Sequence, residues 1–154
     1  MKPVTQTRFG APSGNCTEAC IASLLECELG DVPDLWDPDA PVDDLSFRVA
    51  TTNRLWEWLK REHGVMWSVA KGPPGSNLYA HFDGFAGHHH MIGGLNAAGV
   101  GHMVVGLDGR QIWDPNPTRA GLVVVEEVVY LTPLDMVASA YQAWPAVEFA
   151  ARLA

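Results

Sequence analysis

The dipeptide Asp108-Gly109 constrains the fold most, because it stands between two short apolar segments. Residues 103–107 (MVVGL) precede it and residues 110–113 (RQIW) follow it. An Asp-Gly pair between apolar runs is a strong short-range signal for a β-hairpin. The sequence therefore predicts two antiparallel strands joined by a tight turn.

The length of this turn decides which residues face one another across the hairpin. A two-residue turn pairs Leu107 with Arg110. In that register His102 and Asp114 lie on opposite faces of the sheet, because side chains alternate along a strand. A three-residue loop, with Gly109 left-handed in a bulge, pairs His102 directly with Asp114 on one face. We expect the three-residue loop, since the glycine that it demands is present.

The remaining elements place helices first and strands afterwards. Helices are expected over residues 16–26 and from about 51 to 63, where Gly64 suits a left-handed helix cap. Residues 31–44 read as an irregular loop, and the glycine-rich residues 93–101 as a mobile rim of the site. Further strands are expected at 65–70, 78–82, 88–92 and 122–130. This order predicts an α+β domain with an antiparallel meander.

Length and charge exclude several classes of function. A chain of 154 residues with 47% hydrophobic and 18% charged residues is typical of one globular domain, residues 1–154. Ten basic against eighteen acidic residues give a net charge of -8, which argues against a nucleic-acid partner. No apolar run is long enough for a membrane span, and residues 1–8 lack an apolar signal segment. We therefore expect a cytoplasmic protein without a membrane partner, and its oligomeric state stays open.

Cysteine supplies the candidate nucleophile. Cys16 opens the first helix, whose unpaired N–H groups and partial positive charge favour a thiolate and can hold an oxyanion. We expect Cys20 and Cys27 to be core residues, with a resolving-thiol role as the alternative. A nucleophilic thiol also needs a base and a group that orients the base. His102 and Asp114, at the two ends of the expected hairpin, supply both.

Three short motifs occur in the order Cys, His, Asp: residues 14–16 (GNC), 101–105 (GHMVV) and 112–115 (IWDP). They resemble the papain-like cysteine peptidase superfamily, and most closely its small bacterial and phage branch, the C39-like peptidases. The resemblance covers residues 6 to about 125. It implies a helix carrying Cys16 packed on an antiparallel sheet that carries His102 and Asp114. It also implies that Cys16 is the nucleophile, His102 the base and Asp114 the orienting acid.

The resemblance implies an oxyanion-hole glutamine as well. Gln6 lies ten residues before Cys16, which is further away than the family pattern places this glutamine. Gln6, Asn15 and the backbone N–H groups near Cys16 are therefore alternative candidates for holding the oxyanion.

A run of three histidines, residues 88–90, raises the question of a metal site. In a strand His88 and His90 share one face while His89 takes the other, which spoils a three-ligand site. No carboxylate or cysteine stands at ligand spacing from them. We expect no metal and no other cofactor, and we expect His89, His90 and Trp113 to line the cleft.

Thiol-dependent hydrolysis of an amide, isopeptide or thioester bond is the function that this pattern predicts. The substrate would be a peptide, a protein or a small acyl compound, and its identity stays open. Acyl transfer to an amine by the same three residues is one alternative. A catalytically silent papain-like module that binds a peptide is the other.

Overall fold

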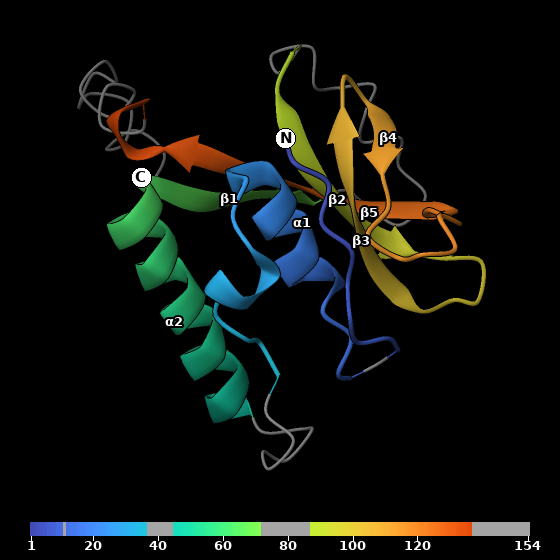
Figure 1. Cartoon of the computed structure of the whole chain (residues 1–154), viewed down its shortest axis with the longest axis horizontal. Coiled ribbons are helices and arrows are strands. Elements are labelled where there is room, and N and C mark those ends of the chain that lie inside the picture. The colour runs from blue at the N-terminus through green and yellow to red at the C-terminus, as the bar shows by residue number, and fades with distance from the viewer. Residues whose placement is uncertain (11, 37–44, 72–86, 137–154) are drawn as a thin grey trace, which may run out of the picture.

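The computed structural model describes residues 1–10, 12–36, 45–71 and 87–136 (Figure 1). These residues form α1 (Cys16–Leu25), a short 3-10 helix (Leu29–Asp31), α2 (Leu45–His63) and the strands β1 (Val65–Lys71), β2 (His89–Leu95), β3 (Gly101–Leu107), β4 (Arg110–Trp113) and β5 (Val124–Pro133). Helices precede a five-stranded antiparallel sheet, which confirms the α+β class. The strand expected at 78–82 and residues 37–44 of the expected loop lie outside the described residues.

The strand order of the sheet is β1-β5-β2-β3-β4, with every neighbouring pair antiparallel. The expected meander is therefore wrong in one respect. After β4 the chain returns to place β5 between β1 and β2. The β1–β5 ladder runs from Val65 opposite Pro133 to Lys71 opposite Glu127. The last strand is thus an inner strand, hydrogen-bonded on both sides.

Helix α1 packs against β3 and β2, in the middle of the molecule (Figure 1). Its small and apolar side chains are buried on several sides, as the sequence predicts. Ile21 of α1 belongs to one core cluster with Met91 of β2 and with Met103 and Val105 of β3. This packing fixes the helix that begins at Cys16 against β3, the first strand of the hairpin, and against its neighbour β2.

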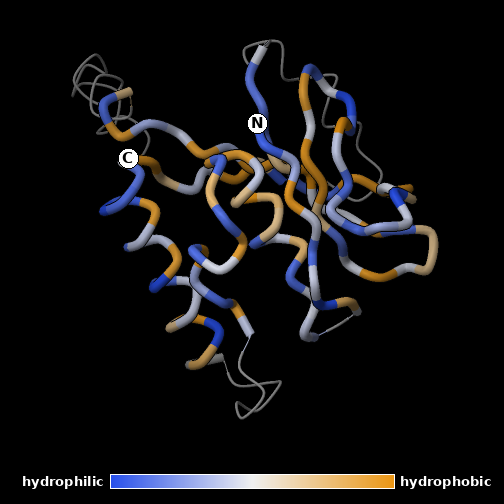
Figure 2. Tube along the Cα trace, in the orientation of Figure 1, coloured by the Kyte–Doolittle hydropathy of each residue, from blue (hydrophilic) through white to orange (hydrophobic). Residues whose placement is uncertain are grey.

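Helix α2 begins at Leu45, six residues before the expected start, and packs against β1. The sequence placed the start at about Thr51. In the structure the buried Thr51 hydroxyl donates to the Phe47 carbonyl at 3.1 Å, so this threonine fits inside the helix. Hydrophobic and hydrophilic segments alternate along α2 (Figure 2). Gly64 follows the helix with a φ of 62°, which confirms the expected left-handed cap. Among the helices that the structure describes, none has the length and apolar character of a membrane span.

The glycine-rich segment contains more β-strand than expected. Residues 93–95 belong to β2, and β3 already begins at Gly101. Only residues 96–100 form the connection, which Asn96 closes by donating its N–H to the Val100 carbonyl at 3.0 Å. The expected loop over 93–101 is therefore wrong, and the rim beside His102 is a short closed turn.

The hairpin between β3 and β4 has a two-residue turn, so the expected three-residue loop is wrong. Leu107 pairs with Arg110, and the turn residues Asp108 and Gly109 have φ values of 49° and 74°. Two consecutive left-handed residues form the turn type whose twist matches antiparallel strands, and Asp-Gly suits it. A glycine with positive φ is required here, as the sequence predicts, although for a different turn.

A β-bulge further along the hairpin changes which face of the sheet the side chains at the end of β4 occupy. Gly106 pairs with Gln111, whereas Val105 pairs with Trp113, so Ile112 has no partner in the β3–β4 ladder. One extra residue in a strand reverses which face the following residues occupy relative to the partner strand. The bulge therefore places the residue after Trp113 on the same face as the even-numbered residues of β3.

Candidate active site

The first eight residues, which we call the N-terminal strap, tie α1 to the end of β4. Val4 donates its N–H to the Ser23 hydroxyl of α1 at 2.9 Å. The Trp113 indole of β4 donates in turn to the Val4 carbonyl at 3.1 Å. Gln6 donates its N–H to the carbonyl of Pro115 at 3.0 Å. The strap thus holds α1 beside the residues that follow β4.

Asn15, which precedes α1, fixes the strap to the start of this helix. Its Oδ1 accepts from the N–H groups of Thr7 and Arg8, both at 3.0 Å, and its Nδ2 donates to the Thr7 hydroxyl at 3.1 Å. Asn15 is 4% exposed. A buried amide needs such partners. Its side chain is therefore engaged in holding the strap.

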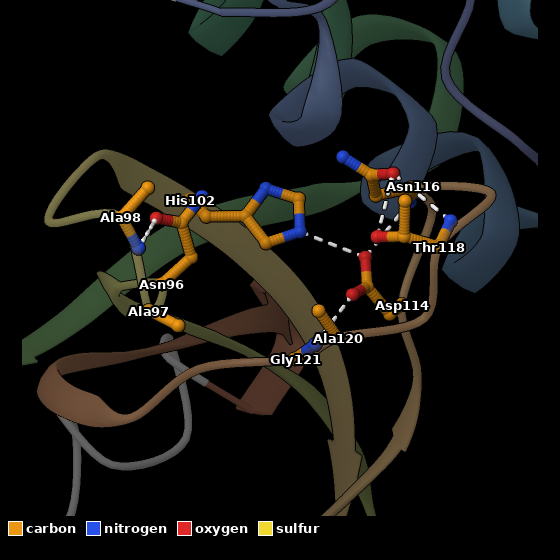
Figure 3. A pocket seen from close by; sticks show the side chains of 9 residues that line it. All are labelled: Asn96, Ala97, Ala98, His102, Asp114, Asn116, Thr118, Ala120 and Gly121. Atoms are coloured by element: carbon orange, nitrogen blue, oxygen red, sulfur yellow. Dashed lines mark hydrogen bonds and ion pairs between the residues drawn. The ribbon is translucent and has the colours of Figure 1, made fainter.

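His102 of β3 and Asp114 after β4 meet directly (Figure 3). Nε2 of His102 donates to Oδ1 of Asp114 at 2.7 Å. Each of the two side chains is 7% exposed, so water competes little for this bond. Because Nε2 is occupied, Nδ1 is the ring nitrogen that can serve a third group.

Two backbone N–H groups hold the Asp114 carboxylate in this orientation. Asn116 donates to Oδ1 at 2.8 Å, and Gly121 donates to Oδ2 at 2.7 Å. With His102, three donors fix the rotation of the carboxylate. Sequence analysis missed both backbone donors. The run of residues 114–116 (DPN) could have indicated the Asn116 donor, since an aspartate commonly accepts from the backbone N–H two residues on.

Arg119 clamps the loop that follows Asp114. Its guanidinium carbon lies 3.4 Å from the centroid of the Trp113 ring, a cation–π contact. Its Nη1 also donates to the backbone carbonyl of Asp114 at 2.8 Å. The Trp113 ring in turn packs against the core cluster that contains Ile21 and Met103. Sequence analysis did not single out Arg119.

Cys16 is the first residue of α1 and is half-buried. Burial lowers the pKa of His102, but hydrogen bonds with the side chains of Cys16 and Asp114, and the charges of both, outweigh it and raise the pKa above its ordinary value. Cys16 and Asp114 therefore both act on the His102 imidazole. The three residues that the sequence singled out are therefore brought together.

Backbone N–H groups at the start of α1 are donors beside Cys16. The first hydrogen bond of the helix runs from the Ala19 N–H to the Asn15 carbonyl at 3.1 Å, and the Asn15 side chain makes no cap. The N–H groups of Cys16 and Thr17 therefore have no partner within the helix. They can stabilise negative charge that develops next to the thiol.

Gln6 lies at the same end of the helix. It is 5% exposed, and its Nε2 donates to the Arg8 carbonyl at 2.8 Å. The same carbonyl accepts from the Asn15 N–H at 3.4 Å, which places the Gln6 amide close to the residue before Cys16. One hydrogen of Nε2 is left over from these contacts. Gln6 therefore stays a candidate oxyanion donor, despite its separation in the sequence.

The other two cysteines occupy different environments. Cys20 is fully buried in the core, and burial, with the nearby charges of Cys16 and Asp114, raises the pKa of its thiol well above the ordinary value. Burial and the charge of Asp31 also raise the pKa of Cys27. Both thiols therefore favour the protonated, unreactive form.

His89 and His90 do not lie beside His102, contrary to expectation. His90 pairs with Gly106, four residues along β3 from His102, and His89 pairs with Leu107. At about 3.3 Å per residue, roughly 13 Å of strand separates His90 from His102. Within the described ranges, no three His, Cys, Asp or Glu side chains gather as a set of metal ligands.

A pocket of about 190 Å³ opens next to the His102–Asp114 pair (Figure 3). One wall is the β2–β3 turn and the other is the loop after β4. The lining residues are Asn96, Ala97, Ala98, His102, Asp114, Asn116, Thr118, Ala120 and Gly121. Trp113, expected in the lining, packs in the core instead.

The site thus combines a half-buried thiol at a helix start, an imidazole with a raised pKa and a fixed carboxylate. Comparison with protein-family models, curated proteins and solved structures found no match. A thiol, a base and an orienting acid in this order can perform nucleophilic acyl transfer.

Proposed function

We propose that the protein is a papain-like, thiol-dependent hydrolase that cleaves an amide, isopeptide or thioester bond. The observation that carries this proposal is the buried 2.7 Å bond between His102 Nε2 and Asp114 Oδ1, with Cys16 interacting with the same imidazole. A helix that starts at the thiol, and adjacent strands that carry the imidazole and the carboxylate, support the papain-like type.

Acylation begins when the Cys16 proton passes to Nδ1 of His102. The thiolate attacks the carbonyl carbon of the substrate, and the carbonyl electron pair moves to the oxygen. N–H groups of Cys16 and Thr17, with Gln6 as a further donor, stabilise this oxyanion. The scissile bond then breaks, and His102 returns the proton to the leaving atom. The acyl group stays on Cys16 as a thioester.

Deacylation repeats these steps with water. His102 removes a proton from the water, whose oxygen attacks the thioester carbonyl. The C–S bond breaks, the acid is released, and the proton returns to Cys16 from His102. Asp114 keeps the Nε2–H tautomer, so that Nδ1 faces the reacting atoms in both steps. No net proton or electron is left over.

The test is whether Cys16 becomes acylated and turns over. We expect p-nitrophenyl acetate to release p-nitrophenol in a burst, with one acetyl group on the Cys16 peptide by mass spectrometry. Cys16→Ala should abolish the burst, whereas the matched Cys27→Ala should retain it. A burst that survives Cys16→Ala, or no acetylation of Cys16 in the wild type, would contradict the proposal. Acetylation without subsequent hydrolysis would favour acyl transfer to an amine.

A further inference from the structure

The pocket beside His102 has a position that the proposed reaction can use. Its lining includes His102 and Asp114 but does not include Cys16. During acylation the acyl group bonds to the thiol, while the leaving nitrogen must lie within hydrogen-bond reach of the imidazole that protonates it. The part of a substrate on the imidazole side is therefore the part that leaves.

The walls of this pocket restrict the size of an occupant. Ala97 and Ala98 stand on one side, and Ala120 and Gly121 on the other (Figure 3). A volume of about 190 Å³ lies below the ~300–1,000 Å³ typical of pockets for larger ligands. The space suits one small amino-acid residue, and a bulky side chain would meet the alanine walls.

Two side-chain amides give the pocket hydrogen-bond donors. The Asn96 carbonyl oxygen accepts from the N–H groups of Ala98 and Val100, at 2.9 and 3.1 Å. The Asn116 carbonyl oxygen accepts from the Thr118 N–H and hydroxyl, at 3.1 and 3.0 Å. These bonds use the oxygen of each amide. The NH₂ groups are therefore the ends available to a carbonyl of the substrate.

We infer that this pocket binds the residue on the leaving side of the scissile bond, and that it selects a small, uncharged residue such as glycine or alanine. The inference rests on the proposed function. Apart from the paired His102 and Asp114, no lining side chain is charged, so the pocket offers a charged residue no ion-pair partner. The class of substrate is thus an amide whose amine part is a small amino-acid unit with its own carbonyl.

The reverse direction of the same step gives a direct test. An amine that enters the pocket attacks the acetyl-enzyme in place of water: its nitrogen bonds to the acetyl carbon, the C–S bond breaks, and its proton passes through His102 to the thiolate. The ratio of acetylated amine to acetate reports how well each amine occupies the pocket. The amines are glycinamide, alaninamide, leucinamide and phenylalaninamide, compared at equal concentrations of free base with p-nitrophenyl acetate as donor.

For the wild type we expect glycinamide and alaninamide to give a ratio about tenfold or more above phenylalaninamide. Ala98→Leu fills the pocket and should lower the alaninamide ratio about tenfold. Ala120→Leu, on the opposite wall, should act in the same direction. Ala50→Leu, an exposed position on α2, is the matched control and should leave the ratio unchanged.

Two results would overturn the inference while leaving the proposed function intact. One is a wild-type ratio that does not depend on the size of the amine. The other is a ratio that neither Ala98→Leu nor Ala120→Leu alters beyond the Ala50→Leu control. If Cys16 is not acetylated at all, the proposed function fails, and the inference fails with it.

Discussion

At the scale of single residues, Asp114 determines what His102 can do. Its two oxygens accept from three donors, one of which is the imidazole. An asparagine has one acceptor oxygen and an NH₂ group, so one buried N–H donor would face another donor. If the NH₂ faces His102, the ring must carry its proton on Nδ1 and can no longer accept one from Cys16.

Asp114→Asn should therefore lower turnover about 10²–10⁴-fold, measured as the steady-state rate of p-nitrophenyl acetate hydrolysis. Because Asp114 is one of the groups that raise the pKa of His102, the variant should also lower this pKa, as followed by NMR titration of the imidazole. Glu126→Gln, at an exposed position on β5, is the matched control. Unchanged turnover in Asp114→Asn would reduce the triad to a Cys–His pair.

At the scale of elements, the β3–β4 hairpin shows both the reach and the limit of sequence reasoning. The Asp-Gly signal predicted the hairpin, and the order of His102 and Asp114 predicted that they meet. The expected three-residue loop was wrong. The turn has two residues, and the bulge at Ile112 is what places Asp114 on the same face of the sheet as His102. A bulge leaves no composition signal, since its position follows from how both strands pack and twist.

Two variants at the end of β4 test whether the position of Asp114 depends on the register of the β3–β4 ladder rather than on the number of residues in β4. Deleting Ile112 removes the unpaired residue but keeps Val105 opposite Trp113, so Asp114 should keep its place. Ile112 is 42% exposed, so little burial is lost. We expect turnover to fall by less than the roughly 10²-fold that an ångström-scale misplacement causes.

The opposing variant inserts one alanine between Trp113 and Asp114. It should turn the carboxylate to the other face and reduce turnover as far as Asp114→Asn does. Circular dichroism should show that both variants fold, so that the comparison concerns register. Equal turnover in the deletion and the insertion would contradict the role of the bulge.

At the scale of the whole molecule, the sequence predicted the α+β class and the placement of α1, but not the strand order. Periodicity and caps are local signals, and they indicated α1, β1 and the hairpin. The place of β5 between β1 and β2 depends on pairing between distant segments. The N-terminal strap is likewise a set of long-range hydrogen bonds, such as Trp113 to Val4, that no spacing in the sequence encodes.

The unfolding free energy of the protein should depend on pH through the protonation of His102. A histidine whose pKa is raised on folding binds its proton more tightly in the folded state. This contribution is fully present below the unfolded pKa of about 6.5 and is lost as the pH rises through the folded pKa. The unfolding free energy of the wild type minus that of His102→Gln, from urea titrations between about pH 5.5 and 8.5, should therefore decrease with rising pH. A difference that is flat, or that increases with pH, would contradict the raised pKa.

The role of Cys16 as a nucleophile activated by His102 is tested most directly by the rate at which iodoacetamide alkylates each cysteine, measured by peptide mass spectrometry across pH. Cys16 should react faster than Cys20 and Cys27, because burial raises the pKa values of those two thiols and keeps them protonated. In His102→Gln the rate of Cys16 alkylation should fall, because the imidazole that accepts the Cys16 proton is gone. Equal profiles for the three cysteines, or a Cys16 profile that His102→Gln leaves unchanged, would contradict the assignment of Cys16 as a nucleophile activated by His102.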